Sequence, residues 1–303
     1  MGIGSFCKCD GFFELMVAPT IGGGERPTLG RYRVEKELGK GAMGVVYLGT
    51  DRHSGRPVAI KILALAQKFE AEALHAVKER FFHEAAIAGR LNHPHVVAIF
   101  SAGEERDLAY IAMEFLKGRD LTHYITPGSL LPLPQVMDII ACVAEALHYA
   151  HANGVVHRDI KPANILYEAA RNAVKVTDFG IAHIAGSSAT PSGRVLGTPG
   201  YMSPEQLAGR NVDGRTDLFS LGVTLYQMVS GRLPFHGDSM PRLMFNIANE
   251  PHIDVLACNP NLPPCLVDII DKALGKQPAE RYQTGDDMAR ALRSCAAAID
   301  IGR

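Results

Sequence analysis

The pattern of hydrophobic and polar positions divides the chain into a first part that predicts strands and a second part that predicts helices. From Tyr32 to Leu63, short apolar and β-branched runs alternate with glycine-containing and polar turns, as expected for an antiparallel meander. Two further runs lie on either side of the polar turn 104–107. Together the runs predict a five-stranded antiparallel sheet at 32–38, 45–48, 58–63, 96–102 and 109–113.

Three segments carry apolar residues at the spacing of a helix face. The first covers residues 74–91 and ends before Asn-His-Pro, which predicts one long amphipathic helix. The second covers 134–154, with proline at its start and glycine at its end. The third, 217–230, is apolar almost all round and is followed by Gly231, which predicts a buried central helix. A short strand is expected at 174–177.

The composition indicates a folded protein without a long-range charge of either sign. The chain has 303 residues, of which 47% are hydrophobic and 21% are charged, so it is long enough to build two separate cores. Lys plus Arg minus Asp plus Glu gives 31 − 32 = −1. This balance provides no basic field that would attract nucleic acid or an anionic membrane, so we expect no nucleic-acid partner.

The sequence predicts a cytoplasmic protein without a membrane span. No apolar run approaches the roughly 18 residues that a span requires, because the best candidate, 139–150, is interrupted by Glu145 and His148. The N-terminus has neither the apolar core of a signal peptide nor a myristoylation pattern. The cysteines have no C-x-x-C spacing, so we interpret them as reduced thiols, although Cys7 and Cys9 offer a weak alternative as metal ligands. They stand at 7, 9, 142, 258, 265 and 295.

The stretch 156–166 concentrates groups that can move a phosphate. The Asp159 carboxylate can accept a proton from a hydroxyl nucleophile, and Lys161 can lie beside the phosphate that is transferred. Asn164, together with Asp178 of the following Asp-Phe-Gly sequence, offers oxygen ligands of the kind that Mg²⁺ prefers. We therefore expect phosphate chemistry at this stretch.

A glycine-rich segment at 39–46 has the pattern G-x-G-x-x-G-x-V between two predicted strands. Glycines allow backbone amides to approach phosphate groups, because no side chain intervenes. A dinucleotide-binding interpretation is disfavoured, since that pattern requires a strand followed by a helix. Downstream, Lys61 stands alone in the apolar strand 58–63, either as an edge-strand surface lysine or as a phosphate ligand, and Ala59 is small enough to admit an adenine ring.

These motifs resemble those of eukaryotic-type serine/threonine protein kinases, in particular the bacterial subgroup. The catalytic loop is similar to H-R-D-x-K-P-x-N, the strand motif to V-A-I-K, and residues 197–205 to G-T-x-x-Y-x-A-P-E. The resemblance covers about residues 31–298 and implies an α+β bilobal fold with a small antiparallel sheet, the family's C helix and a larger, mainly helical lobe. The implied divisions are a flexible tail at 1–30, with a docking segment as the alternative, an N-lobe at 31–113, a hinge at 114–118, a C-lobe at 119–298 and a C-terminal tail at 299–303.

The resemblance also assigns candidate site residues for ATP and for Mg²⁺, or Mn²⁺ in its place. Glu84 is preferred over Glu72 and Glu79 as the partner of Lys61, because it lies nine residues before His93. Asp120 is either a ribose ligand or a carboxylate at a helix N-terminus. The catalytic candidates are Asp159, Lys161, Asn164 and Thr198, and the metal ligands are Asn164 and Asp178. The nucleotide-binding candidates are Leu38, Gly39, Gly41, Gly44, Val46, Ala59, Lys61, Glu84, Met113, Glu114, Leu116, Asp120 and Leu166.

The segment between Asp178 and Glu205 is rich in Gly, Ser and Thr, and resembles a kinase activation segment. Arg158, beside the catalytic aspartate, could pair with a phosphate added there. The candidate phosphorylation sites are Ser187, Ser188, Thr190, Ser192 and Thr198. The resemblance further implies that Asp217 binds backbone near the catalytic loop and that Arg281 pairs with Glu205.

The function implied by the resemblance is transfer of the ATP γ-phosphate to Ser or Thr hydroxyls of protein substrates, with autophosphorylation through self-association. Lys161 in the loop disfavours the tyrosine-specific alternative. Because Ala163 carries no charge, a basic substrate motif is not implied. Three alternatives are a pseudokinase or scaffold of the same fold, a small-molecule kinase, and an interaction module that depends on the N-terminal tail.

Overall fold

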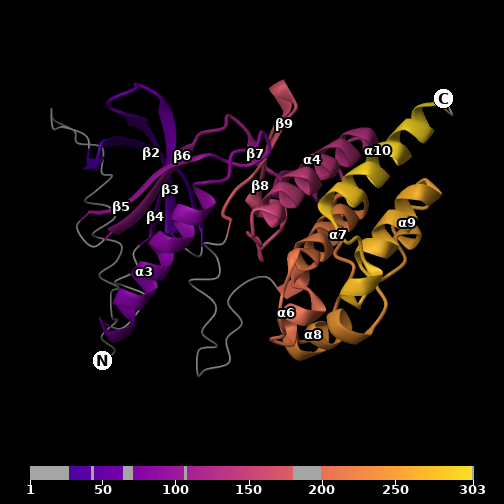
Figure 1. Cartoon of the computed structure of the whole chain (residues 1–303). Helices are drawn as coiled ribbons and strands as arrows, with labels where there is room; N and C mark the ends of the chain where they lie inside the picture. The colour runs from indigo at the N-terminus through magenta and orange to yellow at the C-terminus, as the bar shows by residue number, and fades with distance from the viewer. Residues whose placement is uncertain (1–26, 42–43, 64–70, 106–107, 180–198, 302–303) are drawn as a thin grey trace, which may run out of the picture. The chain divides into compact units, whose positions relative to one another are not determined.

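The computed structural model describes residues 27–41, 44–63, 71–105, 108–179 and 199–301. The chain forms two compact units. The first comprises the residues up to Arg90 together with Ala98–Phe115, and the second comprises Leu91–Val97 together with Leu116–Arg303. An α+β architecture results, with a sheet in the first unit and mainly helices in the second (Figure 1).

The first unit is built on an antiparallel sheet (Figure 1). Its strand order is β1-β2-β3-β4-β6-β5. One helix, α3 (Ala71–Ala88), packs against β5. Alternate residues of β3 are buried, because successive side chains of a strand point to opposite faces, whereas β4 and β6 are buried along nearly their whole length. The strands are β1 (Thr28–Leu29), β2 (Tyr32–Gly41), β3 (Gly44–Asp51), β4 (Pro57–Leu63), β5 (Ile99–Glu105) and β6 (Leu108–Glu114).

The sheet has one strand more than the sequence predicted. β1 precedes the expected start at Tyr32 and pairs with β2, where Leu29 lies opposite Tyr32. A two-residue strand has no hydrophobic period, so only its pairing reveals it. A further difference lies at the end of α3, which stops at Ala88 rather than at Leu91.

Residues Leu91–Val97 pack with the second unit although the chain reaches them directly from the first. Val97 N–H donates to the Val176 carbonyl at 2.9 Å, and Val176 N–H donates to the His95 carbonyl at 2.9 Å. These bonds use the backbone of this segment against β9 (Ala173–Val176), so β5 begins only at Ile99 rather than at the expected residue 96.

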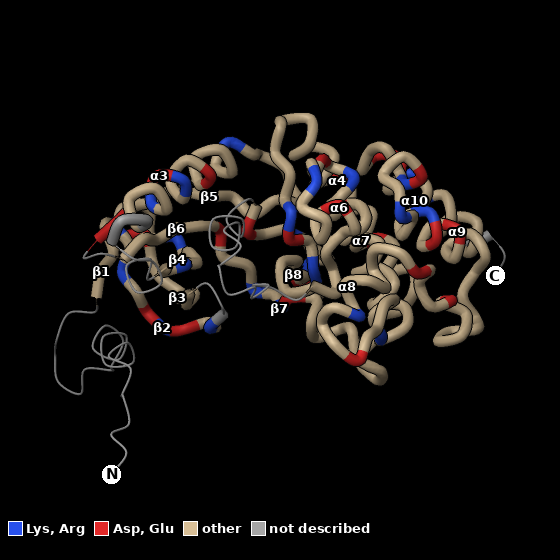
Figure 2. The backbone as a smooth tube through the Cα atoms, turned by 90° about the horizontal axis from the view of Figure 1, so that it is seen from below, with Lys and Arg blue, Asp and Glu red and all other residues tan. Residues whose placement is uncertain are grey.

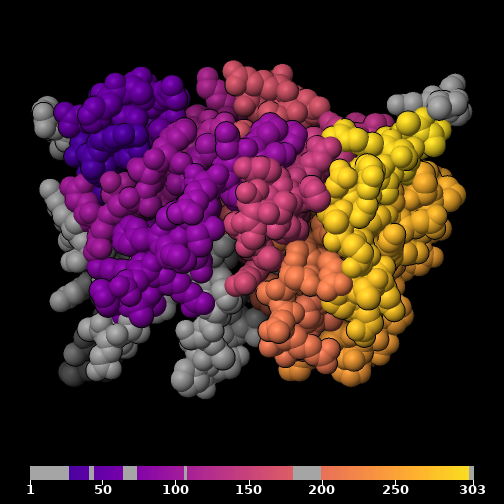
Figure 3. Space-filling model, viewed as in Figure 1, coloured from indigo at the N-terminus to yellow at the C-terminus, as the bar shows by residue number. Residues whose placement is uncertain are grey.

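The second unit is mainly helical, as the apolar periods predicted. Its central helix α7 (Gly214–Ser230) is buried almost all round and contacts α4 (Leu133–Ala152), which lies beside α10 (Gly285–Ile301) in Figures 1 and 3. A small sheet, β7-β8-β9, accompanies these helices. The remaining elements are β7 (Arg119–Asp120), β8 (Ile165–Glu168), α6 (Pro204–Leu207), α8 (Met240–Asn249) and α9 (Pro264–Ala273), with short 3-10 turns between them.

Local sequence explains both ends of α7. Asp213, not Asp217, caps the N-terminus, since its side chain accepts from Arg215 N–H. At the C-terminus, Gly231 adopts φ +71°, a left-handed conformation that glycine adopts without strain. Asp217 therefore lies inside the first turn, where its side chain is free to serve another element.

The expectation of reduced thiols is wrong for Cys265 and Cys295, which form a disulfide between α9 and α10. Their Cα atoms lie 5.7 Å apart because the two helices pack together, and a separation of 30 residues gives no spacing motif. Among the described residues, Cys142 and Cys258 are free cysteines.

Charged positions of both signs are interspersed along the backbone, as Figure 2 shows. This distribution agrees with the net charge of −1. Within the described part of the chain, no helix combines the length and the apolar character needed to cross a membrane.

Candidate active site

The catalytic-loop residues predicted from the sequence lie together in the second unit. Lys161 Nζ donates to both carboxylate oxygens of Asp159, at 2.9 and 2.8 Å. Asn164 Nδ2 donates to the Asp159 carbonyl at 2.7 Å and to its Oδ2 at 2.9 Å. The turn Pro162–Asn164 brings Asn164 back beside the aspartate. An ammonium group and an amide thus fix the carboxylate in one orientation, as a positioned general base requires.

His157 connects the catalytic loop to the strand that ends before Asp178. Its Nδ1 accepts from Asp159 N–H at 3.2 Å, so the proton of the neutral ring is on Nε2, which donates to the Thr177 carbonyl at 2.8 Å. The ring is fully buried and lies 4.7 Å from the ring of Phe179, centroid to centroid. One imidazole therefore ties the backbone around Asp159 to the backbone that carries Asp178.

Asp217 anchors the backbone of the same loop. Its Oδ2 accepts from His157 N–H at 2.8 Å and its Oδ1 from Arg158 N–H at 2.7 Å, as predicted. His151, which the sequence did not single out, adds a hydrogen bond from Nε2 to Oδ2 at 2.7 Å. Because Asp217 is completely buried, charge-assisted bonds of this kind contribute more than they would in water.

Backbone strain accompanies this anchoring. Arg158 has φ +67° and Asp178 has φ +65°, a region that costs an ordinary residue about 1 kcal/mol or more. The Asp217 hydrogen bond to Arg158 N–H and the bond from Thr177 N–H to the Asn164 carbonyl, at 3.0 Å, hold the two strained segments. Such strain is characteristic of functional segments whose side chains need an unusual direction.

The oxygen donors of Asn164 and Asp178 suit a hard divalent cation. Asn164 uses its amide nitrogen on Asp159, which turns its Oδ1 to the other side as a ligand oxygen. Asp178 supplies a carboxylate directly after β9, on the backbone that His157 holds. These donors fit Mg²⁺ better than a softer metal, because neither is a nitrogen or a sulfur.

The predicted phosphate-side residues lie on adjacent strands of the first unit. Across the sheet, Gly39 pairs with Val46, and Val46 pairs with Lys61, so these three residues form one row. Lys61 is only 7% exposed, which excludes the surface-lysine alternative. Ala59, two residues before Lys61 on β4, pairs with Met113 on β6, and each of the two is 8% exposed.

The packing of β3 against β4 requires glycine at position 44. It has φ +157°, and a Cβ there would lie 2.0 Å from the Ile62 carbonyl oxygen. Gly41 is its cross-strand partner, so the two glycines close the β2–β3 hairpin. Residues 42 and 43 of the glycine-rich segment lie outside the described residues.

Glu84 lies on α3 in the same unit as Lys61. Its side chain is 19% exposed and lies 3.6 Å from Arg80, whereas the Glu79 side chain is 72% exposed and lies 3.5 Å from His75. Glu84 is the more buried of the two glutamates, and its pairing with Lys61 stays a prediction. The Glu72 side chain lies outside the described set.

A comparison with known families gives the identity of the fold. Residues 32–292 match the protein kinase domain family. The chain belongs to this family. The resemblance inferred from the motifs is therefore confirmed, as is the bilobal α+β fold class.

Curated relatives of the chain include the serine/threonine-protein kinase PrkC of Bacillus subtilis, 38% identical over 88% of this chain. PknB of Mycobacterium tuberculosis is 40% identical over 85% of this chain. The chain spans 40% of the length of PrkC and 42% of the length of PknB.

The solved structures that resemble the chain include two with a TM-score of 0.71 each. The Mycobacterium tuberculosis PknI kinase domain is 29% identical, covering 90% of this chain and 100% of that one. Rad53 residues 1–466 in complex with AMP-PNP is 26% identical, covering 86% of this chain and 64% of that one.

The remaining nucleotide candidates lie where the chain passes from the first unit to the second and in the small sheet. Glu114 ends β6 in the first unit, and Leu116 begins the long segment of the second. Asp120 pairs with Leu166 across β7 and β8, and its Oδ1 accepts from Thr122 N–H at 2.9 Å. The capping alternative for Asp120 is thus realised, while its contact with ribose stays a prediction. Leu38, on β2, is 42% exposed.

Glu205 and Arg281 form the predicted ion pair deep in the second unit. The Arg281 Nη1 and Nη2 atoms donate to the two Glu205 oxygens at 2.8 Å each, and Thr216 Oγ1 donates to Oε1 at 2.6 Å. Burial acts to raise the pKa of Glu205, but the hydrogen bonds and charge of Arg281, with the Thr216 bond, hold it at about 2. The carboxylate is therefore ionised at neutral pH.

Gln206 and His151, which the sequence analysis did not single out, also support the catalytic loop. Gln206 Nε2 donates to the Arg158 carbonyl at 2.9 Å, and Ser203 and Gln206 form a capping box at the start of α6. The Ser-Pro-Glu-Gln sequence carries the capping signal, but nothing in it indicates the contact with Arg158. Likewise, no pattern in the sequence indicates the contact that His151, near the end of α4, makes with Asp217. Thr198 and the candidate phosphorylation sites at 187–192 lie outside the described residues.

Proposed function

We propose that the chain is a serine/threonine protein kinase that transfers the γ-phosphate of ATP to Ser or Thr hydroxyls of proteins. The observation that carries this proposal is the arrangement around Asp159, whose carboxylate is held by Lys161 and Asn164. A carboxylate fixed in this way can orient a substrate hydroxyl and accept its proton. The kinase names of PrkC and PknB support the same reaction.

The proposed roles divide between the two units. Lys61 and the glycine-rich strands β2 and β3 hold the ATP phosphates, with Glu84 as the partner of Lys61. Asn164 and Asp178 hold Mg²⁺, or Mn²⁺ in its place, which supplies charge neutralisation for the phosphates. Lys161, beside Asp159, neutralises charge on the phosphoryl group in transit. Thr198 is proposed, from the family resemblance, as a further contact of Asp159 and Lys161.

The adenine and ribose contacts are proposed for the residues that follow the first unit's last strand. Backbone groups of Glu114 and Leu116 bind the adenine edge, with Met113 behind it. Asp120 binds the ribose. The remaining residues proposed to line the adenine site are Leu38, Val46, Ala59 and Leu166. The AMP-PNP complex of the similar Rad53 structure supports a nucleotide ligand for this fold.

We further propose that phosphorylation of the segment 187–198 regulates the kinase. Arg158 Nε is buried and has no hydrogen-bond partner among the described residues. A buried guanidinium N–H without a partner is costly, and a phosphate on this segment would supply an acceptor. Mixing active protein with the Asp159→Asn variant tests self-association, because phosphorylation of the inactive chain requires contact between two copies.

A pseudokinase or scaffold is the alternative function. The presence of Lys61, Asp159, Asn164 and Asp178 favours an active enzyme, since each has a proposed role in phosphoryl transfer. Substrates are proposed to be proteins, because the segment 197–205 resembles the one with which protein kinases bind them. We propose the cytoplasm as the compartment because the reaction consumes ATP.

The test uses purified chain, ATP, Mg²⁺ and a peptide mixture that offers Ser, Thr and Tyr separately. We expect phosphate on Ser and Thr but not on Tyr, and its loss in Asp159→Asn. Asp268→Asn, an exposed aspartate on α9, is the matched control and retains activity. ATP binding without turnover under activating conditions supports the pseudokinase alternative, and an Asp159→Asn variant as active as the wild type overturns the proposal.

A further inference from the structure

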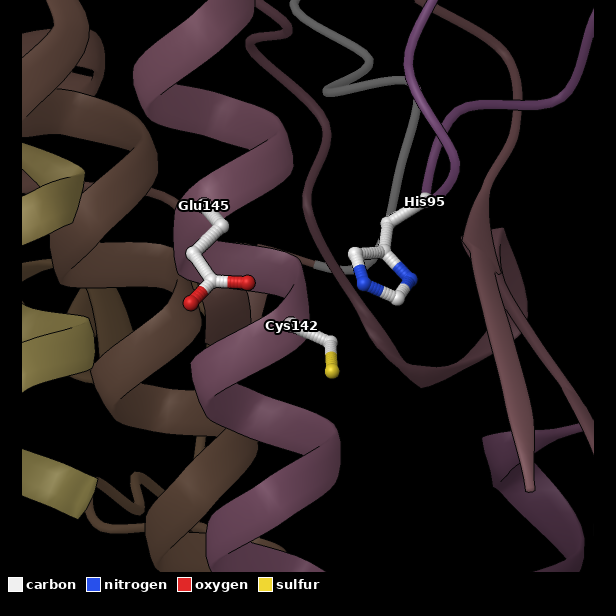
Figure 4. A group of neighbouring side chains, drawn as sticks. All are labelled: His95, Cys142 and Glu145. Carbon is white, nitrogen blue, oxygen red and sulfur yellow. The ribbon is translucent and has the colours of Figure 1, made fainter.

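A second group of potential metal ligands lies in the second unit, formed by His95, Cys142 and Glu145 (Figure 4). One ligand atom from each residue lies within 4.8 Å of the other two. Cys142 and Glu145 lie one turn apart on α4, and His95 lies on the segment Leu91–Val97 that packs beside it. None of the three has a role in the proposed phosphoryl transfer.

The His95 ring is oriented as a metal-binding histidine usually is. Its Nδ1 lies 3.0 Å from the Val174 carbonyl, which can only accept, so Nδ1 carries the proton and Nε2 carries the lone pair. Figure 4 shows one ring nitrogen on the side of Cys142 and Glu145 and the other on the far side. Since Nδ1 is held by β9, Nε2 faces the other two residues.

Glu145 brings a carboxylate to the group and is paired with the guanidinium of Arg293. Arg293 donates to Glu145 through Nε at 3.1 Å and Nη2 at 2.8 Å, and both bonds end on Oε1. Among the described contacts, Oε2 is therefore the oxygen available to a cation. The Asp138 and Glu145 carboxylates and the Arg293 guanidinium are the charged groups that act on Cys142. The two carboxylates favour a divalent cation, which would take the place of the Cys142 thiol proton.

We propose that His95, Cys142 and Glu145 bind a borderline transition-metal ion of the Zn²⁺ class, which links the segment Leu91–Val97 to α4. One nitrogen, one sulfur and one carboxylate oxygen suit Zn²⁺, with water in the fourth position, and do not suit Mg²⁺, which requires oxygen ligands. Bond lengths of about 2.0–2.3 Å in a tetrahedron place ligand atoms about 3.5 Å apart, so the side chains close by about 1 Å. The site is independent of the proposed kinase activity.

The decisive test is a cobalt titration of metal-stripped full chain, followed by absorption spectroscopy with excess Mg²⁺ present. Cys7→Ser and Cys9→Ser remove the N-terminal thiols, and reductant is withheld so that Cys265 and Cys295 stay bonded. We expect a saturable sulfur-to-cobalt charge-transfer band that Zn²⁺ abolishes. The band disappears in Cys142→Ser and persists in Cys258→Ser, the matched control with the other free thiol. Absence of the band, or its persistence in Cys142→Ser, overturns the proposal.

A second measurement addresses the non-sulfur ligands. We expect Zn²⁺ to raise the melting temperature of the wild type, because it binds the folded state. In His95→Gln and in Glu145→Gln, we expect Zn²⁺ affinity to fall by at least about tenfold. We expect the melting temperature without metal to change little in both variants. For Glu145→Gln the reason is that the ion pair of Glu145 with Arg293 is partly exposed. Unchanged affinity in both variants overturns the assignment. Should one variant fail to fold, the other decides.

Discussion

The guanidinium of Arg281 and the carboxylate of Glu205, 76 residues apart in sequence, form two parallel hydrogen bonds of 2.8 Å in the interior of the second unit. The remaining three N–H groups of Arg281 donate to backbone carbonyls. These acceptors are Gly275, Lys276 and Arg215, at 2.7, 3.0 and 3.2 Å. All five donors of a side chain that is 1% exposed are therefore satisfied.

Removing Arg281 should destabilise the fold strongly. In Arg281→Met, the buried Glu205 carboxylate loses its charged partner, which costs about 3–5 kcal/mol. Urea denaturation measures the loss. Arg290→Met is the control, because Arg290 is exposed and its ion pairs with Asp286 and Asp287 contribute less than about 1 kcal/mol. Equal losses in the two variants would contradict the structural role of the buried pair.

The same pair predicts acid lability. The folded pKa of Glu205 is about 2, against an ordinary value of 4.5, so its contribution is fully present above pH 4.5 and is lost as the pH falls toward 2. The shift corresponds to about 3 kcal/mol. Between about pH 5 and about pH 2, the free energy of unfolding should fall more steeply for the wild type than for Glu205→Gln. Parallel curves would show that Glu205 is not the group responsible.

Lys161 should act on the rate rather than on nucleotide binding. Its ammonium lies on the Asp159 carboxylate, where charge on the transferred phosphoryl group would develop. In Lys161→Met we expect kcat to fall by about 10²-fold or more, with a small change in KM for ATP. Lys36→Met, at an exposed position on β2, is the control. A raised KM with unchanged kcat would assign Lys161 to ground-state binding instead.

Asp217 should position the catalytic loop, and its neighbour provides a matched comparison. Asp217 accepts three hydrogen bonds through two oxygens, but an amide has only one oxygen, so Asp217→Asn leaves buried donors unpaired at a cost of about 1–3 kcal/mol. Phosphoryl transfer should fall as the loop loses its anchor. Asp213→Asn should be nearly neutral, because Asn caps a helix as well as Asp. Thermal melts and steady-state rates of both variants measure the difference.

The disulfide between α9 and α10 should contribute to stability in oxidising buffer. It closes a loop with a separation of 30 residues, for which loop-closure entropy predicts about 3–4 kcal/mol. Cys265→Ser should therefore melt at a lower temperature than the oxidised wild type, and at the same temperature as the reduced wild type. Cys258→Ser, which leaves the disulfide intact, serves as the control. A melting temperature insensitive to reduction would contradict this contribution.

The sequence by itself determined most strands of the first unit, three long helices and the order of the motifs. Apolar periods of two and of 3.6 residues located the strands β2 to β6 of the first unit and the helices α3, α4 and α7, because burial of one face leaves that period in the sequence. The short spacing of Asp159, Lys161 and Asn164 sufficed to place them together, since one loop and one turn join them. The resemblance to protein kinases supplied the pairing of Glu205 with Arg281.

Only the tertiary structure decided the contacts between elements that are distant in the chain. The strand β1, the disulfide and the use of His151 on Asp217 depend on partners 30 or more residues away, or on backbone pairing without a period. The His157 ring could be assigned its proton only from its two backbone partners. A hydrogen bond depends on distance and direction in space, and residue type fixes neither. The sequence therefore specified which chemical groups are present, and packing specified which of them meet.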